Sequence, residues 1–192
     1  VEFGTAVAQS RKLAELMGLA HVEVGRPMRV ASDLLRRKEG SQRAVQRGRF
    51  LPGCRAALVL FDADDDCPKT LAPSLRRWAT EAAGEFPSAV VLANREYEAW
   101  FLASLESLRG QRGIGPQAVW DRDPESVRGA KEALSREMIG RRAYSELLDQ
   151  PALTAMADWK LLHQRCRSFR TMVKETRRMF EACGLAPALW PT

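Results

Sequence analysis

Histidine and paired cysteine are scarce in this chain of 192 residues. Its only histidines are His21 and His163, and its four cysteines form no C-x-x-C pair. A structural zinc site needs closely spaced Cys and His ligands, so the sequence argues against one. Cysteines without such pairing or a secretory signal are typical of a reducing compartment. We therefore expect a cytoplasmic protein with free thiols.

Long apolar runs and two common catalytic motifs are also missing. No apolar stretch approaches the roughly 20 residues that a membrane span needs, so we expect no membrane partner. The chain has no G-x-x-x-x-G-K-[ST] motif for ATP phosphates and no G-x-S-x-G motif of a serine hydrolase. The start, Val1–Gly4, has no Met and no basic-then-apolar signal pattern, so we expect residues to be missing before it.

Basic residues are in excess and lie mainly in two segments. The net charge is +6, and hydrophobic and charged residues make up 45% and 28%, as in ordinary globular proteins. Eight basic residues lie in Arg26–Arg49 and seven in Lys160–Arg178. Such segments suit the phosphate backbone of a nucleic acid. The alternative is a solvated surface that is rich in arginine.

Alternating strands and helices predict an α/β fold with a small, mostly parallel sheet flanked by helices. Unbroken apolar runs indicate buried strands at 56–61 and 89–93, and we expect a short strand at 21–24. Helices are expected at 6–17, 31–47 (interrupted by Gly40), 68–85, 94–108 and 168–183, with a loop at 109–124 and short helices after it. We expect residues 1–124 to form an α/β core and residues 125–192 a helical layer packed on the same domain.

Four aspartates follow the first buried strand within five residues: Asp62, Asp64, Asp65 and Asp66. Ligands of open α/β sheets bind just beyond the carboxyl ends of strands. In extended backbone Asp62 and Asp64 would point the same way and Asp66 would continue the alternation. Mg²⁺ prefers one or two carboxylates together with waters and phosphates, so these residues suit a magnesium site. The alternative is an acidic turn that caps the next helix.

A second acidic turn, with Glu96 and Glu98, follows the second buried strand. If the two strands are parallel neighbours, this turn lies beside the aspartates. On a helix the two glutamates would be about 200° apart, so both could not face one metal ion. The alternative is that these acids only stabilise a helix, because negative side chains in the first turn interact favourably with the helix dipole. Lys131, at a predicted helix start, could stabilise phosphate charge or could simply be solvated.

Four segments of the chain carry a resemblance to a known family. They are L-V-L-F-D-A-D-D-D-C-P at 58–68, V-V-L-A-N-R-E-Y-E-A-W-F-L-A at 90–103, R-G-A-K-E-A-L at 128–134 and Y-S-E-L-L-D-Q-P-A-L-T at 144–154. Together they resemble the bacterial TOPRIM-like family DUF4276, over nearly the whole chain. The R-E-x-E-A-W and D-Q-P-A-L segments are fairly specific to that family.

The resemblance implies a compact α/β sheet that binds Mg²⁺ through a Glu after its first strand and a D-x-D after a later one. Asp62 and Asp64 would then be the metal-binding pair. The full hypothesis assigns Asp62, Asp64, Asp66 and Glu98 to Mg²⁺ or Mn²⁺, and Glu2, Glu96 and Lys131 to catalysis. Family members begin with a strand and a V-E-G-x-G-E-like turn, of which only Val1–Gly4 remains here. By its spacing to Gly18, Glu2 matches the later acid of that turn.

TOPRIM domains serve topoisomerases, primases and nucleases of the overcoming-lysogenization-defect type. The resemblance therefore implies a metal-dependent nuclease acting on DNA or RNA. Relatives are often encoded beside an AAA-type ATPase, in arrangements suggestive of phage defence, which implies an ATPase partner. One alternative is a non-catalytic subunit that binds nucleic acid or the ATPase. Another is an aspartyl-phosphate phosphatase with Asp62 as nucleophile and Asp64 as acid. The oligomeric state stays open.

Overall fold

The sheet of this protein is small, parallel and central. The computed structural model describes residues 1, 3–140 and 142–191, so Glu2, a predicted catalytic residue, lies outside the described residues. Within them the sheet has two parallel strands, β1 (Ala57–Asp62) and β2 (Ser88–Ala93). Ala57 pairs with Ser88 and Asp62 with Ala93, so both strands end at the same edge. The α/β prediction and both predicted strands are confirmed. Strand β2 is buried from Ala89 on, as predicted, whereas β1 is only half-buried apart from Phe61. The strand expected at 21–24 is wrong.

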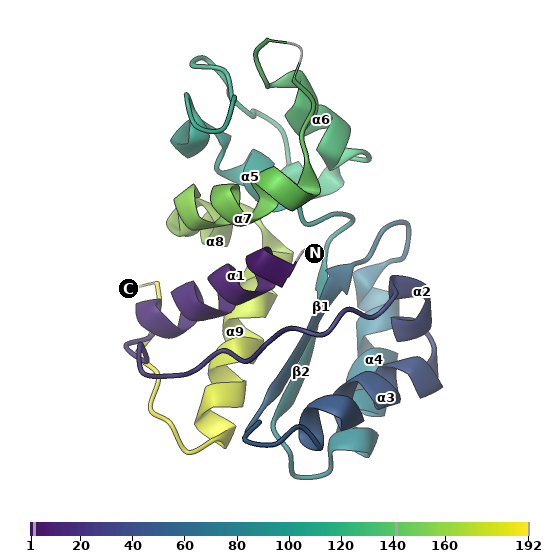
Figure 1. The fold of residues 1–192 in the computed structure, drawn as a ribbon. Coiled ribbons are helices and arrows are strands. Elements are labelled where there is room, and N and C mark those ends of the chain that lie inside the picture. The colour runs from purple at the N-terminus through teal and green to yellow at the C-terminus, as the bar shows by residue number, and fades with distance from the viewer. Residues whose placement is uncertain (2, 141, 192) are drawn as a thin grey trace.

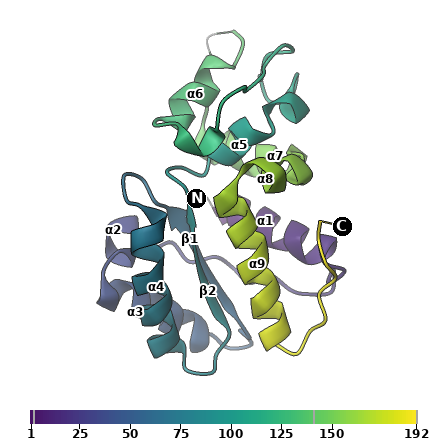
Figure 2. The same cartoon turned by 180° about the vertical axis from the view of Figure 1, so that it is seen from behind.

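Helices cover both faces of the sheet (Figures 1 and 2). On one face lie α3 (Lys38–Arg49) and α4 (Pro68–Ala83), and on the other lie α1 (Phe3–Leu16) and α9 (Arg167–Ala182). The remaining helices are α2 (Ser32–Leu35), α5 (Ala99–Ala103), α6 (Ala130–Arg136), α7 (Glu146–Met156), α8 (Trp159–Arg165) and 3₁₀ turns at Leu105–Leu108 and Pro124–Ser126. Helices α5 to α8 lie beyond the carboxyl edge of the strands (Figure 1). This edge is therefore covered by the chain that follows β2.

Two buried clusters explain why the apolar runs form the centre of the fold. Val90 and Leu92 pack with α3 and α4, whereas Val91 and Ala93 pack with residues of α1, α5 and α9. Strand β2 is therefore buried on both faces, as its unbroken apolar sequence predicts. The cluster that contains Val91 and Ala93 includes residues from Leu13 to Phe180. It joins residues on both sides of the domain boundary predicted at 124. The helical C-terminal part therefore packs on the core, while the boundary itself stays a prediction.

Two predicted helices are divided in the structure. The helix expected at 31–47 is α2 followed by α3, and Gly40 lies inside α3. A Cβ at Gly40 would lie 2.0 Å from the carbonyl oxygen of Leu34, so the glycine permits close contact with α2. The helix expected at 94–108 begins only at Ala99, because Arg95 has a φ of 60° and cannot be helical. These breaks form the turns that carry the site.

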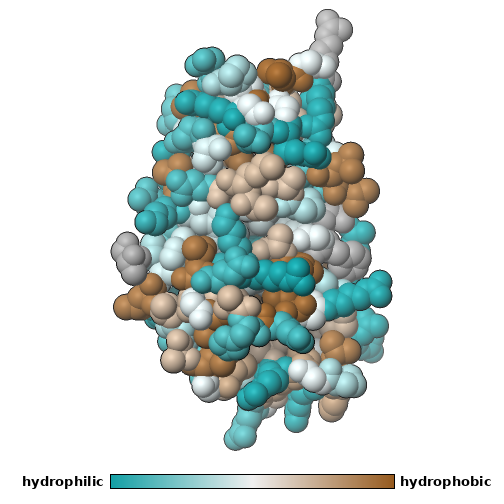
Figure 3. All heavy atoms as spheres, turned by 60° about the vertical axis from the view of Figure 1, so that its left-hand side comes forward, coloured by the Kyte–Doolittle hydropathy of each residue, from teal (hydrophilic) through white to brown (hydrophobic). Residues whose placement is uncertain are grey.

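The surface is mixed in character. Figure 3 shows hydrophilic and hydrophobic residues interspersed over one face of the molecule. All four cysteines are free thiols, as predicted. Among the described residues no helix combines the length and apolarity that a membrane crossing would require.

Candidate metal and phosphate site

The parallel pairing of β1 and β2 places the two acidic segments side by side. The amide of Asp64 donates to the carbonyl of Arg95 at 2.8 Å, which joins the two turns directly. The amide of Tyr97 donates to Oδ1 of Asp62 at 3.0 Å. The prediction that the Glu96–Glu98 turn lies beside the aspartates is confirmed.

The extended alternation expected of the aspartates ends at Asp62, where β1 ends. Asp64 has a φ of 51°, in the left-handed region that turns the chain. Asp64 and Asp66 both bind Arg36, each at 2.7 Å. The prediction that Asp62, Asp64 and Asp66 line up along one extended side is therefore wrong. The chain leaves the strand one residue after Asp62, and Arg36 gathers the later two carboxylates.

The three later aspartates, Asp64–Asp66, form what we call the aspartate turn, and all three are exposed. Asp65 lies 2.9 Å from Nη1 of Arg128 and 3.6 Å from Nη1 of Arg95. Arg36 also donates to the carbonyl oxygens of Asp62 and Ala63, at 2.9 and 3.1 Å. Each carboxylate of the turn is thus neutralised by an arginine of this chain.

Asp62 and Glu98 form a second group, which we call the buried carboxylate pair, although only Glu98 is fully buried and Asp62 is half-buried. The side chain of Glu98 is fully buried at the start of α5. Its Oε1 accepts a hydrogen bond from the Tyr144 hydroxyl at 2.8 Å and one from Nε2 of Gln150 at 2.9 Å. Its Oε2 is buried without a hydrogen-bond partner among the described residues. Such an oxygen is unusual, because buried polar atoms are nearly always bonded.

The environment of the pair disfavours two negative charges. Burial, with the nearby charge of Glu98, raises the pKa of Asp62 to about 7, although the Tyr97 amide and positive groups including Lys131 oppose the shift. Burial also raises the pKa of Glu98, against the hydrogen bonds from Tyr144 and Gln150 and the charge of Lys131. A cation placed between such groups would relieve the unfavourable charge.

Lys131 lies in α6 beside this pair. Its ammonium is 2.5 Å from Oε1 of Glu146, and its side chain is partly buried. Burial alone would lower its pKa, but the bond to Glu146 and the charges of Glu98 and Asp62 raise it overall. Lys131 is therefore a held, charged group, and the solvated lysine considered from the sequence is not what the structure shows.

Glu96 has a different role in the fold from Glu98. Its two carboxylate oxygens accept the backbone amides of Gly129 and Lys131, at 3.0 and 3.1 Å. Glu96 therefore fixes the start of α6, the helix that carries Lys131. Glu96 and Glu98 contact different groups, although neither lies in a helix as the sequence argument assumed. That both could not face one metal ion, and that Glu96 has a catalytic role, stay predictions.

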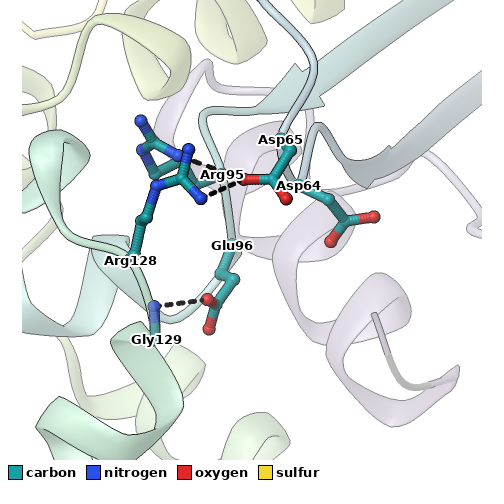
Figure 4. Close-up of a pocket in the computed structure, with 6 residues that line it drawn as sticks. All are labelled: Asp64, Asp65, Arg95, Glu96, Arg128 and Gly129. Carbon is teal, nitrogen blue, oxygen red and sulfur yellow. Dashed lines mark hydrogen bonds and ion pairs between the residues drawn. The ribbon is translucent and has the colours of Figure 1, made fainter.

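An open pocket of about 290 Å³ lies at this edge of the sheet. It is lined by Asp64, Asp65, Arg95, Glu96, Arg128 and Gly129. Figure 4 shows the guanidinium groups of Arg95 and Arg128 converging on the carboxylate of Asp65. Loops after both strands and the start of α6 therefore enclose a space that contains both signs of charge.

Metal binding by the predicted carboxylates stays a prediction. In the described part of the chain, no three His, Cys, Asp or Glu side chains gather as metal ligands. The residues that the structure does gather are the buried carboxylate pair and, separately, Asp64 and Asp66 around Arg36. A single site that uses all four predicted ligands does not follow from this arrangement.

Several residues of this site were not identified from the sequence. Tyr144 and Gln150 bind Glu98 from 46 and 52 residues away. Both lie in the 144–154 segment of the family resemblance, but neither residue type alone indicates a partner for a glutamate. Arg36 belongs to the first basic segment, which suits polyanions, yet it neutralises the protein's own aspartates.

The comparison with protein families confirms the resemblance to DUF4276. The model of a family described as a domain of unknown function, DUF4276, matches residues 7–176. Nothing matches this chain significantly among curated proteins or among solved structures. The matched range contains Asp62, Glu98, Lys131 and their partners. Because the family model covers most of its length, the chain belongs to the DUF4276 family.

Proposed function

We propose that this protein is a metal-dependent phosphodiesterase that acts on DNA or RNA, with a TOPRIM-like site in which Asp62 and Glu98 hold Mg²⁺ or Mn²⁺. The observation that carries the proposal is the buried carboxylate pair. Within the part of the chain that the structure describes, Oε2 of Glu98 is a buried carboxylate oxygen without a hydrogen-bond partner. Such an oxygen is costly to keep in a folded protein. Groups kept in that condition are concentrated at functional sites.

The donor set fits the metal. Mg²⁺ takes oxygen ligands and is commonly held by one or two carboxylates, with waters and substrate phosphates completing the shell. The pair supplies two carboxylates, one with an unpartnered oxygen, just beyond the carboxyl end of a parallel strand. When bound, the ion would lower the pKa of a water and stabilise charge on the phosphodiester.

The residues around the pair orient it. The Tyr97 amide fixes one oxygen of Asp62, while Tyr144 and Gln150 fix one oxygen of Glu98. Each carboxylate therefore keeps an oxygen that these contacts leave for a cation. Such orienting hydrogen bonds are typical around metal-binding carboxylates.

Lys131 supplies positive charge next to the carboxylates. Glu146 holds its ammonium, and Glu96 fixes the backbone at the start of its helix. A fixed cation beside a reacting phosphodiester stabilises the negative charge that develops on its oxygens. We propose this role for Lys131, and a positioning role for Glu96.

Mn²⁺ binding, measured by calorimetry, tests the proposal. We expect Asp62→Asn and Glu98→Gln each to lower the affinity by about 10-fold or more. Asp66→Asn is the matched control, because it removes the same charge from the exposed turn, and it should bind almost as the wild type does. Cleavage assays on single- and double-stranded DNA and RNA would follow. A folded wild-type protein that binds no Mn²⁺, or equal losses in all three variants, would contradict the proposal.

A further inference from the structure

The pocket at the carboxyl edge contains an anion of the protein itself, bound between two arginines. One oxygen of Asp65 lies 2.9 Å from Nη1 of Arg128 and 3.6 Å from Nη1 of Arg95. The two guanidinium groups come from different loops, after β2 and before α6, and both approach this carboxylate (Figure 4). The arrangement is that of a two-arginine anion site with a carboxylate inside it.

Asp65 is weakly held in this position. Its side chain is 78% exposed and that of Arg128 is 73% exposed. Ion pairs between exposed side chains contribute about 0–1 kcal/mol, because water screens them and side-chain freedom is lost. A phosphate, which offers several oxygens to the fork of a guanidinium, binds arginine more strongly than such a carboxylate does. Phosphate could therefore displace Asp65.

The other two carboxylates of the pocket are bound to different groups. Asp64 binds Arg36 at 2.7 Å. Both oxygens of Glu96 accept backbone amides at the start of α6. If Asp65 alone moved away, the guanidinium groups of Arg95 and Arg128 would therefore be available to an incoming anion. The rest of the pocket would not need to rearrange.

The backbone that carries Arg95 is fixed in an uncommon conformation. Arg95 and Asp64 both have φ in the left-handed region, at 60° and 51°. Arginine adopts this region seldom, and such residues cluster at ligand sites. The hydrogen bond from the Asp64 amide to the Arg95 carbonyl holds the two turns together. The same turns lead to Glu98 and, through Arg128, to Lys131, so the pocket adjoins the buried carboxylate pair.

We infer that Arg95 and Arg128 form a phosphate clamp, and that Asp65 occupies this clamp until a phosphate group displaces it. This inference rests on the proposed function and deepens it, since the clamp would hold a phosphate of the substrate beside the buried carboxylate pair. Asp65 then competes with the ligand for the two arginines and weakens the binding of a single anion. A ligand with several phosphates is affected less, because its other phosphates can be bound elsewhere on the protein.

Equilibrium binding in EDTA tests the clamp without metal or turnover. The probes are inorganic phosphate and a fluorescent oligothymidylate that lacks terminal phosphates. Asp65→Asn should tighten binding about 5- to 10-fold, as expected when roughly 1 kcal/mol of competition is removed. The matched control is Glu85→Gln, which removes one exposed charge beyond the opposite end of the sheet and should change binding less than about 2-fold.

Arginine variants complete the test. Arg128→Gln should weaken binding about 5- to 10-fold, whereas Arg76→Gln, at an exposed position of α4, should have little effect. In the double variant Asp65→Asn/Arg128→Gln the gain from Asp65→Asn should vanish. Thermal unfolding of each variant confirms that it is folded. Equal effects of Asp65→Asn and Glu85→Gln would overturn the clamp.

The two probes separate the sources of phosphate. If both bind with this dependence on Asp65 and Arg128, the clamp accepts phosphodiesters of a nucleic acid backbone. If only inorganic phosphate does, the clamp stands and its ligand is a free or terminal phosphate. The result is also separate from the proposed function: Asp65-dependent binding without any Mn²⁺ binding would retain the clamp and reject the metal enzyme. If the wild type binds Mn²⁺ and cleaves nucleic acid, but Arg128→Gln leaves phosphate binding unchanged, the metal enzyme is retained and the clamp is rejected.

Discussion

The two groups of carboxylates at the carboxyl edge of the sheet differ in depth and in their partners. The aspartate turn is exposed, and its members bind Arg36, Arg95 or Arg128. The buried carboxylate pair is bound by a backbone amide, a tyrosine hydroxyl and an amide side chain. Four residues of sequence, Asp62 to Asp65, thus contain both kinds of site.

The difference in burial between the two groups indicates which carboxylates are expected to bind a metal ion or take part in catalysis. Exposed ion pairs contribute little to stability and are common on protein surfaces. A buried carboxylate whose charge is not fully compensated lowers stability, so its presence calls for another reason. By this argument the density of aspartates in the sequence is less informative than the burial of Glu98 beside the half-buried Asp62.

The largest expected effect is on catalysis. Glu98→Gln should lower metal-dependent cleavage on the order of 10³-fold, because it removes one of two carboxylates that would bind the ion and the charge that balances it. The measurement is the initial rate of oligonucleotide cleavage with Mn²⁺, at several metal concentrations. Asp66→Asn should stay within about 3-fold of the wild type. A larger loss in Asp66→Asn than in Glu98→Gln would reverse the comparison.

The next effect is on stability and its dependence on pH, measured in EDTA by urea unfolding. The pKa of Asp62 is raised from an ordinary 3.8 to about 7 in the folded protein. Between about pH 4 and 7 the folded state therefore keeps a proton that the unfolded state has lost, so the free energy of unfolding falls as pH rises through this window. Asp62→Asn should be more stable than the wild type by about 2–4 kcal/mol at pH 8, with the difference shrinking toward pH 4.

The asparagine variant isolates the charge, because its Oδ1 can still accept the Tyr97 amide. Asp66→Asn should show no comparable gain, since Asp66 is exposed and bound to Arg36. If Asp62→Asn were less stable than the wild type at pH 8, the carboxylate would be a stabilising group, and the argument from buried charge would fail.

Local patterns in the sequence predicted the elements that position the site. The apolar runs predicted β1 and β2 to within one residue. A strand buried on both faces needs an unbroken apolar run, and β2 is such a strand, whereas β1 is only half-buried. Their parallel pairing then placed the acidic turns side by side, since parallel strands end at the same edge. The helix predicted at 168–183 is α9, and its apolar residues Phe169, Met172, Val173 and Phe180 are buried.

Local sequence patterns could not predict the orientations of the site residues, because these depend on contacts between distant segments. The left-handed φ of Asp64 and Arg95 is stabilised by a hydrogen bond between two turns that are 31 residues apart in sequence, so neither turn predicts it alone. The D-x-D spacing suggested one metal pair because it assumed extended backbone. The left-handed turn at Asp64 instead lets Asp62 bind the Tyr97 amide and Asp64 bind Arg36. Glu98 could not be ranked above Glu96, because its burial depends on Tyr144 and Gln150 from distant segments.

A smaller effect concerns the support of the aspartate turn. Arg36→Gln removes two ion pairs, two hydrogen bonds to the carbonyls of Asp62 and Ala63, and packing over the ring of Phe61. Because the freed carboxylates are exposed and can be solvated, we expect a loss of only about 1–2 kcal/mol in the free energy of unfolding. Urea unfolding measures it, with Arg76→Gln as the control. A loss above about 4 kcal/mol would show that the turn is as important to the fold as a buried network.

The smallest effect on stability is expected at Asp65. Asp65→Asn should change the free energy of unfolding by no more than about 0.5 kcal/mol, because the Asp65 side chain is 78% exposed and water screens its ion pairs. Thermal unfolding at low and moderate salt measures it, and any difference should shrink as salt rises. The same substitution is expected to tighten phosphate binding. A side chain that affects ligand binding more than folding belongs to the site and not to the scaffold, so a stability loss above about 1.5 kcal/mol would move Asp65 to the scaffold and remove the distinction between it and Arg36.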